Sequence, residues 1–425
     1  MRIDQVPYRT LKSIFHQRDR VGVEAEERSR RESPAAIHWD LMIGGSQMFA
    51  LMTPEVGALI ERIMSFEPKI QAEWDGLPGR ARIDYLNRMV IDEIQATNEI
   101  EQVRSTRKEI SAAIKAVRAE QPAENKRFME MVRLYLDIGS DKAKSPQTLD
   151  EVREIYDAVT AGEIRDEDAP DGLRFRQGPV SIESGTKTVH TGVVPESAID
   201  DALTLMLSQG RDDSIPQLIR AVAAHFIFEY AHPFYDGNGR TGRYLLALDL
   251  RQVLAPYASL ALSATVADNK DRYYRAFTDA ENPLNRGDLT PYLIEMLEII
   301  AEAQHRLLLD LSERREKIDS IAARLRVLVN DKEFPLNIGL DRESAPPVDP
   351  DDIAKILFPL GQAHYFDVNR AVRLKTLADA MERSIQFARP RLQRLDDAGI
   401  IETVTRKPLR FRLTPRGASL LELDG

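Results

Sequence analysis

Apolar residues recur at helical intervals along most of this 425-residue chain. The spacing predicts a helix that begins at Pro54 after a Thr53 cap. Between Tyr85 and Val117 it predicts one long helix or two joined ones. Further helices are expected at 124–138, 148–161, 196–209, 214–231, 239–254 and from Leu289 to about Val329.

Residues 173–192 interrupt this helical pattern. They alternate in polarity, are rich in β-branched side chains and contain a Ser184-Gly185 turn. These features predict a β-hairpin in a helical background. The hairpin sequence alone does not distinguish an ordinary surface hairpin from a functional one.

The C-terminal part shows a different organisation. Five prolines fall within 331–360, which predicts a linker at 331–351. After it, the sequence LKTLADAMERS, a second helical segment that ends at Gly399 and a hairpin with a basic tip follow in order. Helix, helix and hairpin in this order are typical of a winged helix-turn-helix domain.

Composition narrows the possible classes of function. The chain has no cysteine, which excludes disulfides, thiolate nucleophiles and zinc sites with sulfur ligands. No apolar run reaches the roughly 18 residues of a membrane span, and the N-terminal residues lack the apolar stretch of a signal peptide. We therefore expect a cytoplasmic protein that does not interact with membranes.

Charge is unevenly distributed along the chain. The whole chain has a net charge of −10, but residues 371–425 contain 11 Lys or Arg against 7 Asp or Glu. The predicted winged helix could therefore bind DNA phosphates, or it could serve protein contact or dimerisation. The basic residues that could contact DNA are Arg389, Arg391, Arg394, Arg406, Lys407, Arg410 and Arg412.

The segment HPFYDGNGRTGR at residues 232–243 concentrates the candidate chemistry. It joins two helical stretches, so its glycines fall at a helix N-terminus, where free N–H groups favour an anion. Arg240 and Arg243 share a helix face and are suited to phosphate groups. Asp236 is suited to Mg²⁺, and His232 to accepting a proton from a hydroxyl. Together they indicate chemistry at a nucleotide phosphate.

Three other interpretations of this segment compete with this one. Gly237, Gly239 and Gly242 match the dinucleotide-binding fingerprint, but that fingerprint follows a strand, and here a helix precedes it. A simple structural turn leaves the two arginines unexplained, as does a metal pair without phosphate. The chain contains no GxxxxGK[ST] phosphate loop.

These twelve residues resemble the Fic family motif HPFx[D/E]GNGRxxR at every defined position, and the likeness extends over about residues 50–300. The resemblance implies transfer of AMP from ATP to a Ser, Thr or Tyr hydroxyl of a target protein. It implies that His232 is the base and that Phe234 anchors the loop. Asp236 would hold Mg²⁺, Arg240 would bind the β-phosphate and Arg243 the γ-phosphate. The resemblance assigns nucleotide binding to Asp236, Gly237, Asn238, Gly239, Arg240, Thr241, Gly242, Arg243, Tyr273 and Tyr274.

Two further stretches are similar to the family. Val180, Ser181 and Ile182 lie in the predicted hairpin, which in the family is a flap that pairs with a target segment by strand addition. Tyr273 and Tyr274 resemble the tyrosines of the adenine pocket, although helical aromatic pairs are more often core residues. The family's Asn-Glu pair is reversed here as Glu281-Asn282, so neither residue is assigned to adenine.

An upstream segment resembles the family's inhibitory motif [S/T]xxxE[G/N]. Thr97 and Glu101 match it, and Gln102 departs from the usual Gly or Asn. The resemblance implies that Glu101 pairs with Arg243 and blocks productive binding of ATP. In some family members the same glutamate supports hydrolytic removal of AMP.

The resulting prediction is a mainly α protein with a Fic-type helical core, a small β-hairpin flap and a C-terminal winged helix-turn-helix domain. Its function would be that of an autoinhibited adenylyltransferase that acts on a target protein or on itself. A second copy of the chain, in a homodimer, is among the expected partners. The alternatives are a DNA-binding regulator whose Fic core senses nucleotide, a deAMPylating Fic enzyme and a Fic enzyme that transfers another phosphate-linked group. The expected parts are an N-terminal segment of unassigned role (1–50), a helical region with the inhibitory helix (51–140), the catalytic core (141–330), the linker (331–351) and the winged helix (352–425).

Overall fold

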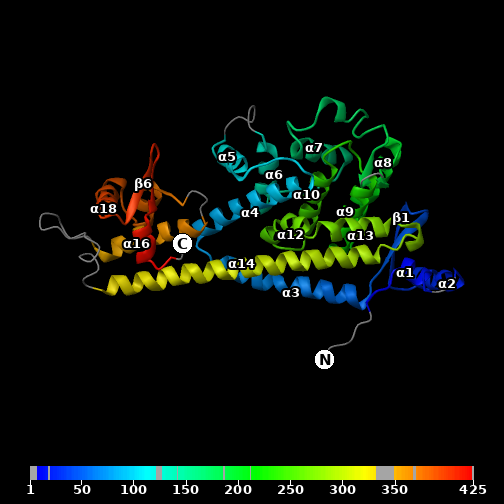
Figure 1. Cartoon of the computed structure of the whole chain (residues 1–425), viewed down its shortest axis with the longest axis horizontal. Coiled ribbons are helices and arrows are strands. Elements are labelled where there is room, and N and C mark those ends of the chain that lie inside the picture. Colours follow the sequence, from blue (N-terminus) through cyan, green and yellow to red (C-terminus); the bar gives the residue numbers. More distant parts are fainter. Residues whose placement is uncertain are drawn as a thin grey trace, which may run out of the picture. The chain divides into compact units, whose positions relative to one another are not determined.

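The computed structural model describes residues 7–17, 20–120, 127–140, 142–184, 187–210, 212–331, 349–366 and 370–423. These residues are mainly helical, and their strands form three small sheets (Figure 1). The predicted mainly α fold class is therefore confirmed. The chain divides into two compact units, Met1–Gln71 with Met89–Leu307, and Ala72–Arg88 with Leu308–Gly425.

Three long helices contribute residues to both units: α3 (Pro54–Gly76), α4 (Gly79–Ile100) and α14 (Thr290–Asn330). The predicted Thr53 cap of α3 is present, since Thr53 Oγ1 accepts a hydrogen bond from Val56 N at 3.2 Å. The segment predicted as one helix or two is two: α4 ends at Ile100, and α5 (Arg107–Arg118) begins after a capping box formed by Thr106 and Glu109.

The centre of the first unit is a pair of helices, α9 (Gln217–Ala231) and α10 (Asn238–Leu250) (Figure 1). Residues 218–228 of α9 and 240–248 of α10 are buried without a break. A helix that is buried on all sides needs other helices around it. The remaining helices of this unit are α6 (Met129–Gly139), α7 (Leu149–Val159), α8 (Glu196–Gln209), α11 (Pro256–Ser259), α12 (Leu262–Asp268) and α13 (Lys270–Ala280).

The N-terminal segment, whose role the sequence leaves open, is folded in its described part. It forms α1 (Leu11–Phe15), α2 (Arg20–Arg31) and a hairpin of β1 (Ala36–Ile43) and β2 (Ser46–Leu51). Strand β2 also bonds the segment before α14, because Phe49 N donates to Gly287 O at 2.9 Å and Leu289 N donates to Phe49 O at 2.8 Å. This segment is therefore an integral part of the first unit.

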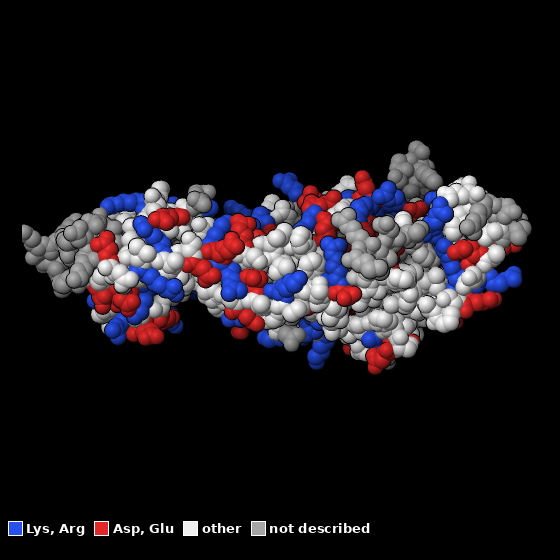
Figure 2. All heavy atoms as spheres, turned by 90° about the horizontal axis from the view of Figure 1, so that it is seen from below, with Lys and Arg blue, Asp and Glu red and all other residues white. Residues whose placement is uncertain are grey.

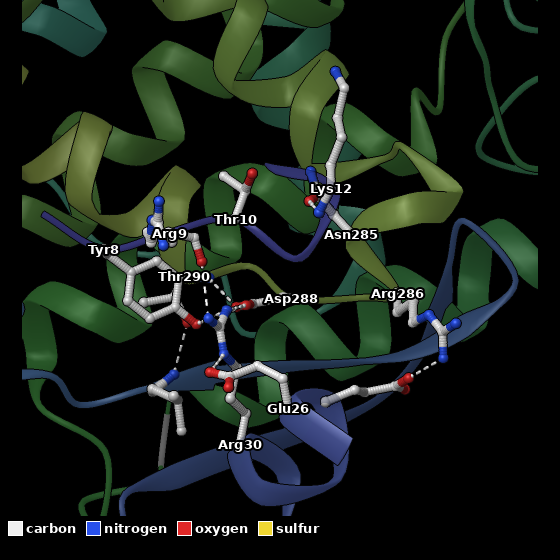
Figure 3. Close-up of polar contacts among 12 residues, drawn as sticks. Tyr8, Arg9, Thr10, Lys12, Glu26, Arg30, Asn285, Arg286, Asp288 and Thr290 are labelled. Carbon is white, nitrogen blue, oxygen red and sulfur yellow. Dashed lines mark hydrogen bonds and ion pairs between the residues drawn. The ribbon is translucent and has the colours of Figure 1, made fainter. Parts of the chain in front are cut away.

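A buried ion pair fastens α2 to the start of α14 (Figure 3). Arg30 Nη1 lies 2.9 Å from Asp288 Oδ2, and both side chains are almost completely buried. Tyr8 Oη donates to the same carboxylate oxygen at 2.6 Å, and Thr290 N donates to Asp288 Oδ1 at 3.0 Å. Arg30 Nη2 donates to Arg9 O at 2.9 Å. Both charges are thus hydrogen-bonded, which is what makes their burial tolerable.

We expect Asp288→Ala to lower the free energy of unfolding by about 3–5 kcal/mol, because it removes the buried carboxylate that Arg30, Tyr8 and Thr290 share. The carboxylate that Arg30 then keeps in the described part of the chain is that of Glu26, whose side chain is 35% exposed. Chemical denaturation followed by circular dichroism measures this change. The matched control is Asp279→Ala, which removes only the Lys12–Asp279 pair, whose side chains are more than a third exposed, and should cost less than about 1 kcal/mol. Equal effects of the two variants would contradict a stabilising role for the buried Arg30–Asp288 ion pair.

The second unit has its own apolar core, contributed by the C-terminal part of α14 and by the elements that follow. These are α16 (Pro350–Phe366), β5 (Val372–Arg373), α17 (Leu374–Ala380), α18 (Ile385–Asp397), β6 (Ile401–Arg406), β7 (Leu409–Leu413) and α19 (Pro415–Leu420). The strands form a sheet in the order β5-β7-β6. The predicted helix, helix and hairpin are thus present, whereas α16 was not predicted; the winged-helix assignment stays a prediction.

The predicted linker at 331–351 falls mostly on residues 332–348, which lie outside the described residues. Among the described helices, none combines the length and the apolar character that crossing a membrane requires.

Candidate active site

The motif of residues 232–243 forms the junction between α9 and α10. His232 ends α9 in the left-handed conformation at φ 48°, and its N–H donates to Phe228 O at 3.0 Å. Gly237 precedes α10 at φ 82°, and a Cβ there would lie 2.6 Å from Thr160 Cγ2. Both the backbone conformation and the space therefore require glycine at position 237.

The loop between the two helices is held closed by its own side chains. Asn238 accepts a hydrogen bond from Phe234 N at 2.9 Å and donates to Phe234 O at 2.8 Å. Thr241 Oγ1 donates to Gly237 O at 2.9 Å. The buried Phe234 ring stacks on Tyr156 with centroids 3.5 Å apart. The side chains of Asn238 and Thr241 thus shape the loop, which leaves the N-terminal turn of α10 to meet a ligand.

The imidazole of His232 is oriented for accepting a proton. Its Nδ1 lies 3.3 Å from Glu229 O, and because a carbonyl only accepts, Nδ1 carries the hydrogen and Nε2 keeps its lone pair. Burial, followed by the nearby His190 ring and the Arg176 guanidinium, lowers the pKa of His232 to about 4. The ring therefore stays unprotonated at neutral pH.

Arg176 is a positioning residue that the sequence did not reveal. Its buried guanidinium donates to His232 O at 2.8 Å and to Gly178 O at 2.6 Å. It also donates to Val193 O at 2.9 Å and to Ala231 O at 3.2 Å. One side chain thus ties both ends of the 178–193 segment to the end of α9.

Arg243 is buried and binds both residues of the predicted inhibitory motif. Its Nη2 lies 2.7 Å from Glu101 Oε1, and its Nε donates to Thr97 Oγ1 at 2.8 Å. Thr97 O accepts a further bond from Nη2 at 3.2 Å. The structure therefore brings together residues 97, 101 and 243, as the sequence predicts.

Arg240 is also paired with a carboxylate from outside the motif. It is fully buried and forms an ion pair with Glu163, which in turn lies 2.7 Å from Arg127. Its Nε has no hydrogen-bond partner in the described part of the chain. A buried donor of this kind fits an anionic ligand, and neither Glu163 nor Arg127 was identified from the sequence.

The position of Glu101 follows from how α4 ends. Gln102 N donates to Glu99 O at 3.1 Å, Val103 N donates to Asn98 O at 2.8 Å, and Gln102 lies in the left-handed conformation at φ 58°. These bonds make a Schellman motif in which Glu101 is the C-cap residue. Position 102 follows the C-cap and adopts the left-handed conformation, which Gly and Asn adopt most easily. Glutamine at this position therefore has a conformational cost.

We expect Gln102→Gly to raise the free energy of unfolding by about 0.5–1 kcal/mol, since glycine adopts the left-handed conformation without steric penalty. Thermal and urea unfolding measure the gain. Gln102→Ala is the matched control, because alanine keeps the penalty, and it should give no gain. A stabilisation of the same size in both variants would indicate a cause other than the backbone.

The Glu101 carboxylate occupies the N-terminal turn of α10. A Cβ added to Gly239 would lie only 2.2 Å from Glu101 Oε1. At this turn the helix has free N–H groups and the positive end of its dipole, so a carboxylate is favoured there, as a phosphate would be. Glu101 thus lies where the sequence predicts the anion cradle.

Asp236 lies at the exposed edge of this turn. Its Oδ1 accepts a hydrogen bond from Gly237 N at 2.6 Å. Among the described residues, no three His, Cys, Asp or Glu side chains gather into a metal site. One exposed carboxylate beside a phosphate cradle nevertheless fits Mg²⁺, which in such sites takes one or two carboxylates and the phosphates of the substrate.

Glu229 is a buried carboxyl group close to Arg243 that the sequence did not reveal. A Cβ on Gly242 would lie 2.1 Å from its Oε1, so glycine at this position lets the Glu229 carboxyl group lie against α10. Burial raises the pKa of Glu229 to about 8, with Arg243 opposing the shift and Glu101 adding to it. Glu229 is therefore mostly protonated at neutral pH, which leaves Glu101 as the charged partner of Arg243.

The two tyrosines predicted to line an adenine pocket differ in exposure. Tyr273 is buried, and its hydroxyl donates to His225 Nε2 at 2.8 Å, because Nδ1 of that ring donates to Gly242 O. Burial lowers the pKa of His225 to about 3, so this ring is neutral. Tyr274 is 38% exposed, with Lys270 Nζ 5.6 Å from its ring. Contact with adenine stays a prediction for both.

The predicted hairpin is confirmed as β3 (Ser181–Ser184) and β4 (Lys187–Thr191), while residues 185 and 186 of its turn lie outside the described residues. Ser181 pairs with Thr191 and Ile182 with His190. Val180 O accepts a hydrogen bond from Gly192 N at 3.0 Å. Ile182 is 36% exposed, as an edge that receives a target strand would be, but docking stays a prediction.

The basic residues of the second unit are partly neutralised. Arg391 lies 2.9 Å from Asp352 and stacks on Phe387, and Arg412 pairs with Glu402. Positions 406 and 407 are exposed at the hairpin tip. Acidic and basic side chains alternate over the face shown in Figure 2. DNA binding by this unit stays a prediction.

The fold and the site together define a class of protein. Its members are mainly helical, and a loop that contains a histidine leads directly into the buried, glycine-rich N-terminus of a helix. Residues 146–250 match the family model described as the Fic/DOC family. These residues form a domain of the Fic/DOC family, which confirms the family that the motif predicts. Members of this family typically transfer nucleoside monophosphates to proteins.

Several solved structures are similar to this chain. A Fic family protein from Desulfovibrio desulfuricans is 20% identical with a TM-score of 0.49, and the match covers 86% of this chain and 97% of that one. Fic-1 from C. elegans is 18% identical with a TM-score of 0.42, covering 71% and 81%. A Fic domain containing signaling protein from Bacteroides thetaiotaomicron is 13% identical with a TM-score of 0.40, covering 61% and 98%.

Proposed function

We propose that this protein is a protein adenylyltransferase that moves AMP from ATP to a hydroxyl side chain of a target protein or of itself. The observation that carries the proposal is the arrangement around α10. An imidazole with its Nε2 lone pair available, a glycine-rich helix N-terminus and two buried arginines lie within one twelve-residue loop and helix start. A protein that only sensed a nucleotide would not need the base.

The proposed chemistry uses these groups in turn. His232 Nε2 takes the proton of the target hydroxyl, and the hydroxyl oxygen bonds to the α-phosphorus of ATP while the bond to pyrophosphate breaks. The first N–H groups of α10, together with Arg240 and Arg243, hold the phosphate oxygens. Mg²⁺, when bound at Asp236, supplies charge neutralisation on the phosphates. Positioning and electrostatics account for the acceleration.

The same proposal includes autoinhibition by Glu101. Its carboxylate takes the guanidinium of Arg243 and lies against Gly239, where a phosphate would otherwise be held. Arg240 is engaged as well, by Glu163. ATP therefore competes with two carboxylates, and the Arg243 pair is the one that the inhibitory motif supplies.

Incubation of the full-length Glu101→Gly protein with Mg²⁺ and ATP tests the proposed reaction. ATP labelled at the α-phosphorus should label the protein, ATP labelled at the γ-phosphorus should not, and the intact mass should rise by whole AMP residues. Label from the γ-position would instead indicate phosphate transfer. Label from neither position, in the presence of cell extract as a source of targets, would contradict the proposal.

A further inference from the structure

A second imidazole lies beside His232 and has no part in the chemistry described so far. His190, on β4 opposite Ile182, has only 8% of its side chain exposed. Its Nδ1 lies 2.7 Å from Glu281 Oε2. Its Nε2 is buried and has no hydrogen-bond partner within the described residues. A buried ring nitrogen without a partner requires an explanation.

The geometry of the two rings suggests that they work together. The ring centroids of His190 and His232 are 5.8 Å apart, at an interplanar angle of 56°. In the neutral ring, His190 Nδ1 donates to the Glu281 carboxylate, which only accepts, just as His232 Nδ1 donates to Glu229 O. Both rings thus keep Nε2 available to accept a proton.

The surroundings of the two rings differ in charge. His232 faces His190, the Arg176 guanidinium and the Glu101 carboxylate. Burial, with His190 and Arg176, lowers its pKa to about 4, and Glu101 opposes this shift. His190 faces the Glu281 carboxylate and the Tyr230 ring at 5.7 Å. A proton on His232 is therefore poorly accommodated. His190, by contrast, has a carboxylate 2.7 Å from its Nδ1.

We propose that His190 and Glu281 form a proton-accepting dyad that receives, through His232, the proton of the target hydroxyl. This inference rests on the proposed transferase activity. As the hydroxyl oxygen bonds to the α-phosphorus and pyrophosphate leaves, the hydroxyl proton passes to His232 Nε2. It then passes to His190 Nε2, directly or through one water, which leaves an imidazolium paired with Glu281 and returns His232 to its neutral form.

Variants of the full-length Glu101→Gly protein test the dyad, with AMP incorporation from α-labelled ATP as the readout. We expect His190→Ala and Glu281→Gln each to lower kcat by about 10- to 100-fold while KM for ATP stays within about twofold. Added imidazole should restore part of the activity of His190→Ala, and it should restore no activity to Glu281→Gln. Tyr230→Phe is the matched control. It keeps the ring that lies 5.7 Å from His190, removes only the hydroxyl that donates to Met42 O, and should retain the parent's activity.

The outcomes separate the dyad from the reaction itself. A His190→Ala variant as active as its parent would overturn the dyad and leave the proposed function intact. A loss of activity that imidazole does not restore would show that His190 acts only structurally, and this too would overturn the dyad. If the parent itself transfers no AMP, the proposed function fails and the dyad fails with it.

Discussion

The full-length His232→Ala protein is expected to transfer AMP about 10²- to 10⁴-fold more slowly than its parent, because the variant has no group that takes the hydroxyl proton. The comparison belongs in the Glu101→Gly background, where the parent rate is highest. Binding of ATP should change little, since the imidazole is not part of the phosphate cradle. Labelling rates and equilibrium binding of a non-hydrolysable ATP analogue measure the two quantities.

The pH dependence gives a second test of His232. Only the unprotonated ring accepts a proton, and its pKa is lowered from 6.5 to about 4. In the Glu101→Gly protein that also carries His190→Ala, where His232 is the only imidazole of the pair, transfer should therefore stay nearly constant as the pH falls from 7 to about 5. It should decline only near 4, within the range where circular dichroism shows a folded protein. A rate that halves near pH 6.5 would contradict the buried environment of this ring.

Glu101→Gly is expected to raise AMP transfer about 10- to 100-fold. The variant removes a charge-assisted bond of about 1.5–3 kcal/mol that ATP must otherwise displace from Arg243. The gain should appear mainly at low ATP concentration. Initial rates of labelling over a range of ATP concentrations measure it.

Glu99→Gly is the matched control for this variant. Glu99 is exposed on the last turn of the same helix, so its loss tests the effect of introducing glycine near the end of α4. Transfer should stay at the wild-type level. If Glu101→Gly is no faster than the wild type, Glu101 is not an inhibitor. If the wild type removes AMP from a labelled target and Glu101→Gly does not, Glu101 serves hydrolysis instead.

The sequence predicted those parts of the site that are continuous in the chain. Residues 232–243 place a base, a carboxylate, glycines and arginines at a helix start, and a local pattern suffices to recognise this arrangement. The pairing of Arg243 with Glu101 bridges 142 residues and was predicted only because the upstream segment resembles a known motif. The hairpin and the principal helices followed from their hydrophobic period and their caps.

The remaining residues of the site could not be predicted because each lies far from the motif and has no distinctive neighbours. Arg176 binds main-chain carbonyl oxygens, which no side-chain pattern encodes. Glu163 and Glu229 resemble the many surface glutamates of this chain until tertiary packing buries them. His190 and Glu281 meet across 91 residues. The N-terminal segment is rich in charge, and its role emerged only from the buried pair of Arg30 with Asp288.

The C-cap position of Glu101 makes the proposed autoinhibition sensitive to the length of α4. One residue inserted into or deleted from α4 would turn everything beyond it by about 100° around the helix axis and carry the carboxylate away from Arg243. A ligand or partner that lengthened the helix by unwinding the left-handed turn at Gln102 would have the same effect without altering the sequence. The strength of the proposed inhibition could therefore change in evolution through the backbone conformation at position 102 alone, without any change to residues 232–243.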